Sequence, residues 1–240
     1  MLSFALGSIP IRIHISFWFT AALLGMSRDP IDLIVWILAV LVSVLLHELG
    51  HALTGKIFGL APQIELYAFG GATSWQNGNQ LSSWKRVLIS LAGPLTGIAL
   101  GAITFVAVAQ SGISPWHLDE WILEAHARNS IKAMAVLSFA RSMLWINLLW
   151  SLFNLLPILP LDGGNVMAHT FAALSKGGGR RAAHIISAVV AAAIGTGLFV
   201  KFGTLYILVI LYMGLFSFQN IRALQPANDE APPPPTRQRW

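Results

Sequence analysis

The sequence contains no cysteine and few charged residues. The lack of cysteine excludes disulfide bonds and thiolate metal sites, so any bound metal must be held by histidine, aspartate or glutamate. Charged residues make up 10% of the chain and hydrophobic residues 55%, whereas soluble domains carry about 25% charged residues. This composition predicts a helical protein that crosses the lipid bilayer several times.

Acidic residues are also scarce: the chain has 15 basic and 10 acidic residues, which gives a net charge of +5. In a soluble chain such a balance is typical of nucleic-acid binding. Here the basic residues flank apolar runs, where they interact with anionic lipid headgroups and set the orientation of the spans. We therefore expect the lipid bilayer, and no nucleic acid, as a partner.

Six apolar runs are long enough to cross a bilayer as helices, which takes about 20 residues each. They cover Ile9–Met26, Ile31–Phe58, Trp84–Ala109, Ser130–Leu156, Ala182–Val200 and Thr204–Asn220. Residues 64–75 alternate in part between apolar and polar, which predicts a short β-hairpin between the second and third spans. The expected fold class is an all-α polytopic membrane protein with about six transmembrane helices and this one hairpin.

We expect one membrane-embedded domain over residues 1–222 and a disordered cytoplasmic tail over residues 223–240, which contains a run of prolines. Basic loops stay in the cytoplasm, so a count of basic residues predicts the orientation. With the N-terminus inside, ten basic residues lie inside and four outside. The inside set is Arg12, Lys56, Lys85, Arg86, Lys176, Arg180, Arg181, Arg222, Arg237 and Arg239, and the outside set is Arg28, Arg128, Lys132 and Lys201. Both termini are therefore expected in the cytoplasm.

Two histidines and a glutamate lie near the end of the second apolar run, in the segment His47-Glu48-Leu49-Gly50-His51. Ionisable groups at membrane depth cost free energy, so they indicate function. On a helix, His47 and His51 share a face and can both reach one metal ion. Glu48 is placed to act on a water rather than to bind the metal. A pair of buried, hydrogen-bonded histidines is the structural alternative, but it leaves Glu48 unexplained.

A catalytic zinc ion typically takes three protein ligands and leaves a fourth position for water. Asp162 is the best third ligand, because the spans place no other carboxylate besides Glu48 at membrane depth. The second and fourth spans run in the same direction, so they bring His51 and Asp162 to the same depth, although 111 residues separate them. The alternative role for Asp162 is to cap the short helix that follows it.

Three further polar residues lie on or near the apolar spans. Asn154 precedes the break at Pro157 and can bond a substrate backbone or an oxyanion, or instead hold two helices together. Asn147 shares its helix face. His14 can approach the metal or bind a headgroup or a helix-end carbonyl. The sequence does not decide whether His14 or Asn147 contributes to the site.

These residues predict a metallopeptidase, in which Glu48 takes a proton from an attacking water and returns it to the leaving amine. A membrane metal-ion transporter is one alternative, but it needs ligands on both sides of the midplane, whereas the polar groups cluster on one side. A non-catalytic membrane scaffold is the other alternative, and it gives Glu48 no use.

The segments His47–His51 and Asn154–Gly164 resemble the paired zinc motifs of the site-2 protease family, the intramembrane zinc metalloproteases of peptidase family M50. Three further segments are similar to parts of that family's core, namely Phe69–Gly71, Ala92–Leu95 and Ile9–His14. The resemblance implies one zinc ion near the cytoplasmic surface. It also implies residue roles: ligands His47, His51 and Asp162, catalytic acid and base Glu48, and substrate contact Asn154.

The resemblance also implies the substrate class, a single-span membrane protein cut within or near its transmembrane segment. The segment 64–75 could pair with an unwound substrate as a strand, with Gly70 and Gly71 allowing close approach. Family members often carry a PDZ domain or two CBS domains, which this sequence lacks, so a separate regulatory partner could select substrates. Gly97 stands where the family often has asparagine, so that contact is not expected here.

Overall fold

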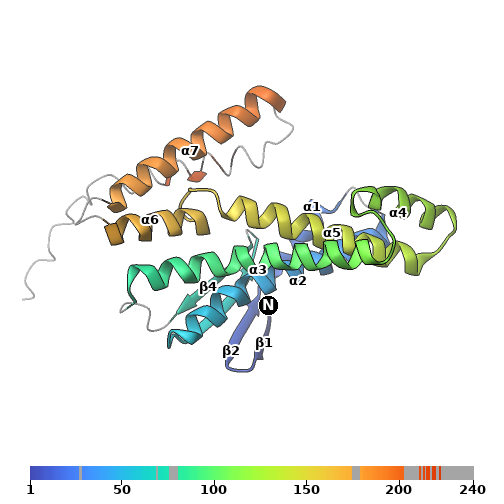
Figure 1. The fold of residues 1–240 in the computed structure, drawn as a ribbon, viewed down its shortest axis with the longest axis horizontal. Helices are drawn as coiled ribbons and strands as arrows, with labels where there is room; N and C mark the ends of the chain where they lie inside the picture. The colour runs from blue at the N-terminus through green and yellow to red at the C-terminus, as the bar shows by residue number, and fades with distance from the viewer. Residues whose placement is uncertain are drawn as a thin grey trace, which may run out of the picture.

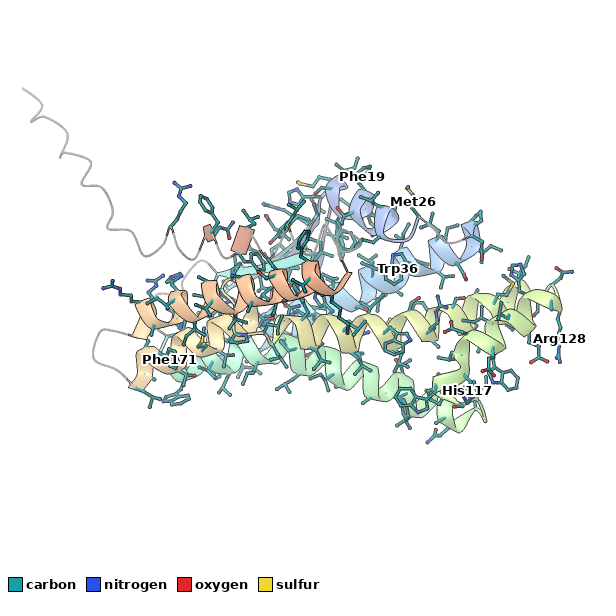
Figure 2. All side chains as sticks on the ribbon, turned by 90° about the horizontal axis from the view of Figure 1, so that it is seen from above. Phe19, Met26, Trp36, His117, Arg128 and Phe171 are labelled. Carbon is teal, nitrogen blue, oxygen red and sulfur yellow. The ribbon has the colours of Figure 1, made fainter. Side chains whose placement is uncertain are left out.

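The structure is a computed structural model that describes residues 1–202 except 27–28, 69, 76–80 and 175–178, together with isolated positions between 211 and 222. Its strands are β1 (Leu2–Leu6), β2 (Ile9–Ile13), β3 (Pro62–Tyr67) and β4 (Gly70–Trp75). Its helices are α1 (Ile15–Leu24), α2 (Pro30–Ile57), α3 (Ser83–Gln110), α4 (Leu118–Ala127), α5 (Ile131–Asn154), α6 (Asp162–Leu174) and α7 (Gly179–Phe202), with a short 3-10 helix, η2 (Pro115–His117). Figure 1 shows α2, α3 and α5 side by side, α7 inclined above them against α6, and the strands gathered at one flank. Figure 2 shows the same fold from above with its side chains.

Four described helices are long and apolar enough to span a membrane: α2, α3, α5 and α7. They correspond to the second, third, fourth and fifth predicted spans, with ends that differ by a few residues. The chain therefore has the character of a multi-pass membrane protein. The sixth predicted span and the tail fall mostly outside the described residues.

The first predicted span, Ile9–Met26, is wrong as a single helix. Its first part is β2, and its second part is α1, whose ten residues are too few to cross a bilayer. The reason is an alternation inside the apolar run: Ile9, Ile11 and Ile13 are buried, while Pro10 and Arg12 between them are exposed. This period of two is typical of a strand with one covered face.

The four strands form one sheet in the order β1-β2-β3-β4. The chain neighbours pair antiparallel, but β2 and β3 pair parallel, with Ile11 opposite Ile64 and Ile13 opposite Leu66. These side chains pack on α2 around Val44 and Ala52. The β-structure is thus larger than the predicted hairpin, because the N-terminal strands extend it and lie beside the second half of α2.

Glycines allow the three central helices to pack closely. A Cβ on Gly50 of α2 would meet the Thr96 hydroxyl and the Ala92 carbonyl of α3, and a Cβ on Gly97 of α3 would meet the Ser151 hydroxyl of α5. Small residues at helix contacts are how membrane helices gain van der Waals contact. This packing holds α2 and α3 against each other at the depth of the histidine pair.

We expect Gly97→Val to lower the midpoint of thermal unfolding in detergent, because the added side chain separates α3 from α5. Overpacking of this kind typically costs about 1–3 kcal/mol. The matched control is Gly197→Val on α7, where an added Cβ meets nothing within 4 Å. Equal midpoints for the two variants would contradict this account of the helix contact.

Candidate active site

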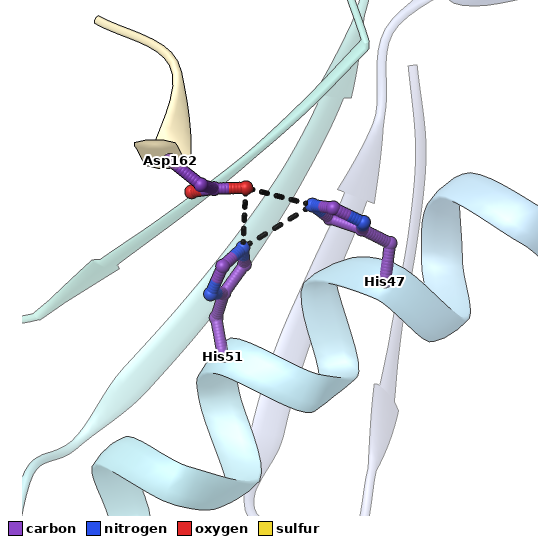
Figure 3. A group of neighbouring side chains, drawn as sticks. All are labelled: His47, His51 and Asp162. Carbon is purple, nitrogen blue, oxygen red and sulfur yellow. Dashed lines mark hydrogen bonds and ion pairs between the residues drawn. The ribbon is translucent and has the colours of Figure 1, made fainter. Parts of the chain in front are cut away.

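Three side chains from two distant parts of the chain converge on one point. The Nε2 atom of His47 lies 3.1 Å from Oδ2 of Asp162, and Nε2 of His51 lies 3.3 Å from the same oxygen. The two Nε2 atoms are 3.3 Å apart. Figure 3 shows the histidines on consecutive turns of α2 and Asp162 at the start of α6, opposite them. The structure therefore brings together the three residues that the sequence selected.

These distances fit a zinc ion. Zinc binds histidine nitrogen and carboxylate oxygen at about 2.0–2.2 Å in a tetrahedron, so neighbouring ligand atoms lie about 3.3–3.5 Å apart. The three separations between Nε2 of His47, Nε2 of His51 and Oδ2 of Asp162 are 3.1, 3.3 and 3.3 Å. The donor set, two imidazoles and one carboxylate, matches that of known catalytic zinc sites with an open fourth position.

A hydrogen bond from α3 orients one of the histidines. Nδ1 of His51 lies 2.7 Å from the carbonyl oxygen of Ile89, which can only accept, so Nδ1 carries the proton. In the neutral ring, Nε2 then offers its lone pair toward His47 and Asp162. Such an outer contact fixes the tautomer and the ring orientation of metal-binding histidines.

Gly93 of α3 forms the floor of this site. A Cβ at this position would meet Nε2 and Cε1 of His51 and would lie 2.7 Å from Nε2 of His47. The missing side chain therefore leaves space beside the atoms that would bind the ion. This glycine adjoins Pro94, which is buried inside α3.

Glu48 lies beside the three converging residues but does not join them. Its side chain is 6% exposed, and its Oε2 accepts a hydrogen bond of 2.7 Å from the Thr73 hydroxyl on β4. A Cβ on Gly71 would collide with the Glu48 carboxyl group, so the glycine makes room for it. The sheet thus positions this buried carboxylate as a group separate from His47, His51 and Asp162.

A cavity of about 420 Å³ opens at this point. It is lined by Glu48, the three converging residues, and side chains of β4, α3, α5 and α6. Asn154 borders it, and its Nδ2 donates 2.9 Å to the Trp150 carbonyl of its own helix. Tyr67 borders it as well, and burial together with the nearby Glu48 carboxylate raises the pKa of the tyrosine. Tyr67 therefore keeps its proton at neutral pH and can donate it in a hydrogen bond.

The two residues that the sequence left undecided lie elsewhere. His14 precedes α1 and lies 3.8 Å from Glu65 on the exposed face of the sheet. Asn147 is buried between α5 and α2, where its Nδ2 donates 2.9 Å to Ser43 Oγ and 2.8 Å to the Met143 carbonyl. Neither borders the cavity.

The structure explains why positions 70 and 71 are glycines. Gly70 has φ +120°, which L-residues rarely adopt, and a Cβ there would lie 2.8 Å from the Trp150 ring. Gly71 lies against Glu48. The positions of Thr73, Gly93 and Trp150 at the site were not predicted from the sequence. Only the Gly93-Pro94 pair carried a local signal, because a proline inside an apolar span marks a special position.

Residues 35–132 and 114–198 of the chain match peptidase family M50. The match covers more than half of the sequence, and the chain belongs to this family. Among similar proteins, Rip3 of Mycobacterium tuberculosis, which is named a zinc metalloprotease, is 33% identical over 190 residues, or 76% of this chain and 44% of its own length. A zinc metalloprotease of Methanocaldococcus jannaschii is 29% identical over 92% of this chain and 56% of its own length.

The fold has a counterpart among solved structures. The site-2 protease from Methanocaldococcus jannaschii matches with a TM-score of 0.58 and 24% sequence identity, over 96% of this chain and 98% of that chain. That likeness supports the fold. The chain spans about half the length of the curated relatives it matches.

We expect Asp162→Asn to lose most of its zinc, because the uncharged amide is a poor ligand beside two neutral imidazoles. Zinc per chain in the purified, dialysed protein is measured by mass spectrometry. The control is Asp32→Asn, which alters another carboxylate of the helix bundle, one that accepts a 2.6 Å bond from Ser138. Loss of zinc from both variants, or from neither, would contradict the assignment.

Proposed function

We propose that this protein is a zinc-dependent endopeptidase that cuts membrane-protein substrates within or near their transmembrane segments. The observation that carries the proposal is the convergence of His47, His51 and Asp162 beside the separate, buried Glu48. The family and the zinc metalloprotease names of two relatives support it. The proposed ligands are the three converging residues, with one zinc ion per chain.

A zinc ion held there supplies Lewis-acid polarisation of a peptide carbonyl and acidifies a water molecule. The chain's own residues do the remaining work. The Glu48 carboxylate accepts a proton from the attacking water at one of its oxygens and later delivers it to the leaving amine nitrogen. Thr73 holds the other carboxylate oxygen, so Glu48 keeps one orientation through both proton transfers.

The substrate segment must be extended, because a helix keeps its peptide bonds in internal hydrogen bonds. The edge strand β4 borders the cavity through Gly71, Ala72, Thr73 and Trp75, which supports strand addition of an unwound peptide beside Glu48. Asn154 reaches the same cavity from α5 and is the proposed polar contact to the substrate backbone.

The proposed orientation places the site near the cytoplasm. His51 lies six residues before the end of α2, about 9 Å along the helix axis. Lys56, Lys85, Arg86 and Arg180 are in the terminal turns at this end, as expected for a cytoplasmic face. Because α1 is short and β2 pairs with β3 directly after α2, the N-terminal strands belong to the same side. A single-span substrate and a separate regulatory partner remain part of the proposal.

A transport function has less support. Among the described residues, one group of three His, Asp or Glu side chains could hold a metal ion. A transport path needs further ligands across the midplane. A scaffold would not need a buried carboxylate next to that group.

We expect Glu48→Gln to keep its zinc and to lower kcat by about 10²–10⁴-fold, the usual contribution of a general acid and base. Cleavage is measured by co-expression with a panel of tagged single-span membrane proteins. Glu65→Gln, on the exposed face of the sheet, is the matched control and should cleave as the wild type does. Undiminished cleavage by Glu48→Gln would refute the peptidase mechanism.

We expect Gly70→Ala to raise KM while zinc stays bound. The Cβ of the new alanine displaces Trp150 at the cavity and strains the backbone at the start of β4. Gly7→Ala is the control. Gly7 also has a positive φ, +60°, but lies in the β1–β2 turn with nothing within 4 Å of an added Cβ. An equal effect of both changes on KM would mean that strain alone is responsible and would argue against a substrate role for this end of β4.

A further inference from the structure

One wall of the cavity carries positive charge. Arg86 and Ser90 of α3 and Asn165 and His169 of α6 border the cavity together with Asp162. Within each helix these residues are three or four positions apart, so one face of α3 and one face of α6 form the wall. Figure 1 shows α6 lying along the first half of α3, and the two helices are in contact.

This wall leads away from the metal centre. On α3, Arg86 lies seven residues before Gly93, where an added Cβ would meet both histidines. On α6, His169 lies seven residues after Asp162. Seven helical residues extend about 10 Å along the axis, which is the length of about three residues of an extended peptide.

The far end of the wall is positively charged, because Arg86 lies there. Arg86 is partly buried, and its Nε donates 3.4 Å to the Leu81 carbonyl. Burial and the positive charges of Arg86 and Arg180 lower the pKa of His169, so this ring is a neutral hydrogen-bonding group at pH 7. Among the described residues that line the cavity, the carboxylates are Glu48 and Asp162, both at the metal end.

We propose that Arg86, assisted by His169, binds a substrate carboxylate about three residues from the peptide bond that is cleaved. This selectivity rests on the proposed peptidase function. A guanidinium holds a carboxylate through two parallel hydrogen bonds, and partial burial strengthens the attraction. The carboxylate is that of an aspartate or glutamate side chain or of a peptide C-terminus.

The test uses the full chain, purified in detergent with zinc, and two peptide libraries whose products are sequenced by mass spectrometry. The first library has amidated C-termini, so only side chains supply carboxylates. The second has free C-termini and no acidic side chains. We expect Asp and Glu to be enriched at the third position on one side of the cleaved bond, or cleavage of the second library three residues from its end. Residues distributed evenly at that position, with no cleavage near free termini, would overturn the proposal.

Charge reversal at Arg86 sharpens the test. We expect Arg86→Glu to lower kcat/KM for acidic peptides by about tenfold or more, because at least one charge-assisted hydrogen bond is lost, and to favour Lys or Arg at the same position. Lys85→Glu makes the same charge change one residue away, on a side chain that lies over the Phe58 ring and does not border the cavity. It should keep the acidic preference.

Two results separate this inference from the function on which it depends. Cleavage that requires zinc and Glu48 but shows no acidic preference overturns the inference alone. Absence of any such cleavage overturns the peptidase function, and the inference with it. Zinc content reports whether each variant is folded. Where Arg86→Glu loses zinc, the milder Arg86→Gln takes its place and should abolish the preference without reversing it.

Discussion

Three electron-pair donors lie within 3.3 Å of one another near the C-terminal end of α2. Lone pairs held so close repel unless a proton or a cation lies between them. The surrounding structure maintains this arrangement: consecutive turns of α2 supply the imidazoles, the first residue of α6 supplies the carboxylate, and α3 leaves out a side chain at Gly93. A divalent ion bound by all three atoms would make this close approach favourable.

A second arrangement keeps Glu48 apart from these donors. The sheet packs its apolar face on α2, which brings β4 to the level of Glu48. Thr73 then bonds the carboxylate, and Gly71 gives it space. In the proposed mechanism, different side chains bind the ion and move the protons, although His47 and Glu48 are adjacent on α2.

Much of the site could be predicted from the sequence, because helical spacing alone puts His47 and His51 on one face. Asp162 was reached by comparing the depths at which two parallel spans end, and the structure places it beside the histidines. Thr73 and Gly93 could not be reached in this way. Their roles depend on which segments meet in space, and a threonine or glycine in a sequence does not carry that information.

The long helices could be predicted from the sequence, but the N-terminal strands could not. Long apolar runs gave α2, α3, α5 and α7, because hydropathy over some 20 residues is a strong signal. The first run was misassigned, since its average hydropathy hid the alternation of Ile9, Ile11 and Ile13 with Pro10 and Arg12. The parallel pairing of β2 with β3 joins segments about 50 residues apart, and no local pattern indicates it.

The convergence of His47 and Asp162 also brings together two distant parts of the chain. These residues are 115 positions apart, and the chain has no cysteine with which to form a covalent link. An ion bound by His47 and Asp162 would therefore serve as a tertiary cross-link in a protein without disulfides, because it would close a loop that contains α3, α4 and α5. Loss of the ion would therefore lower the stability of the whole helix bundle and would not affect catalysis alone.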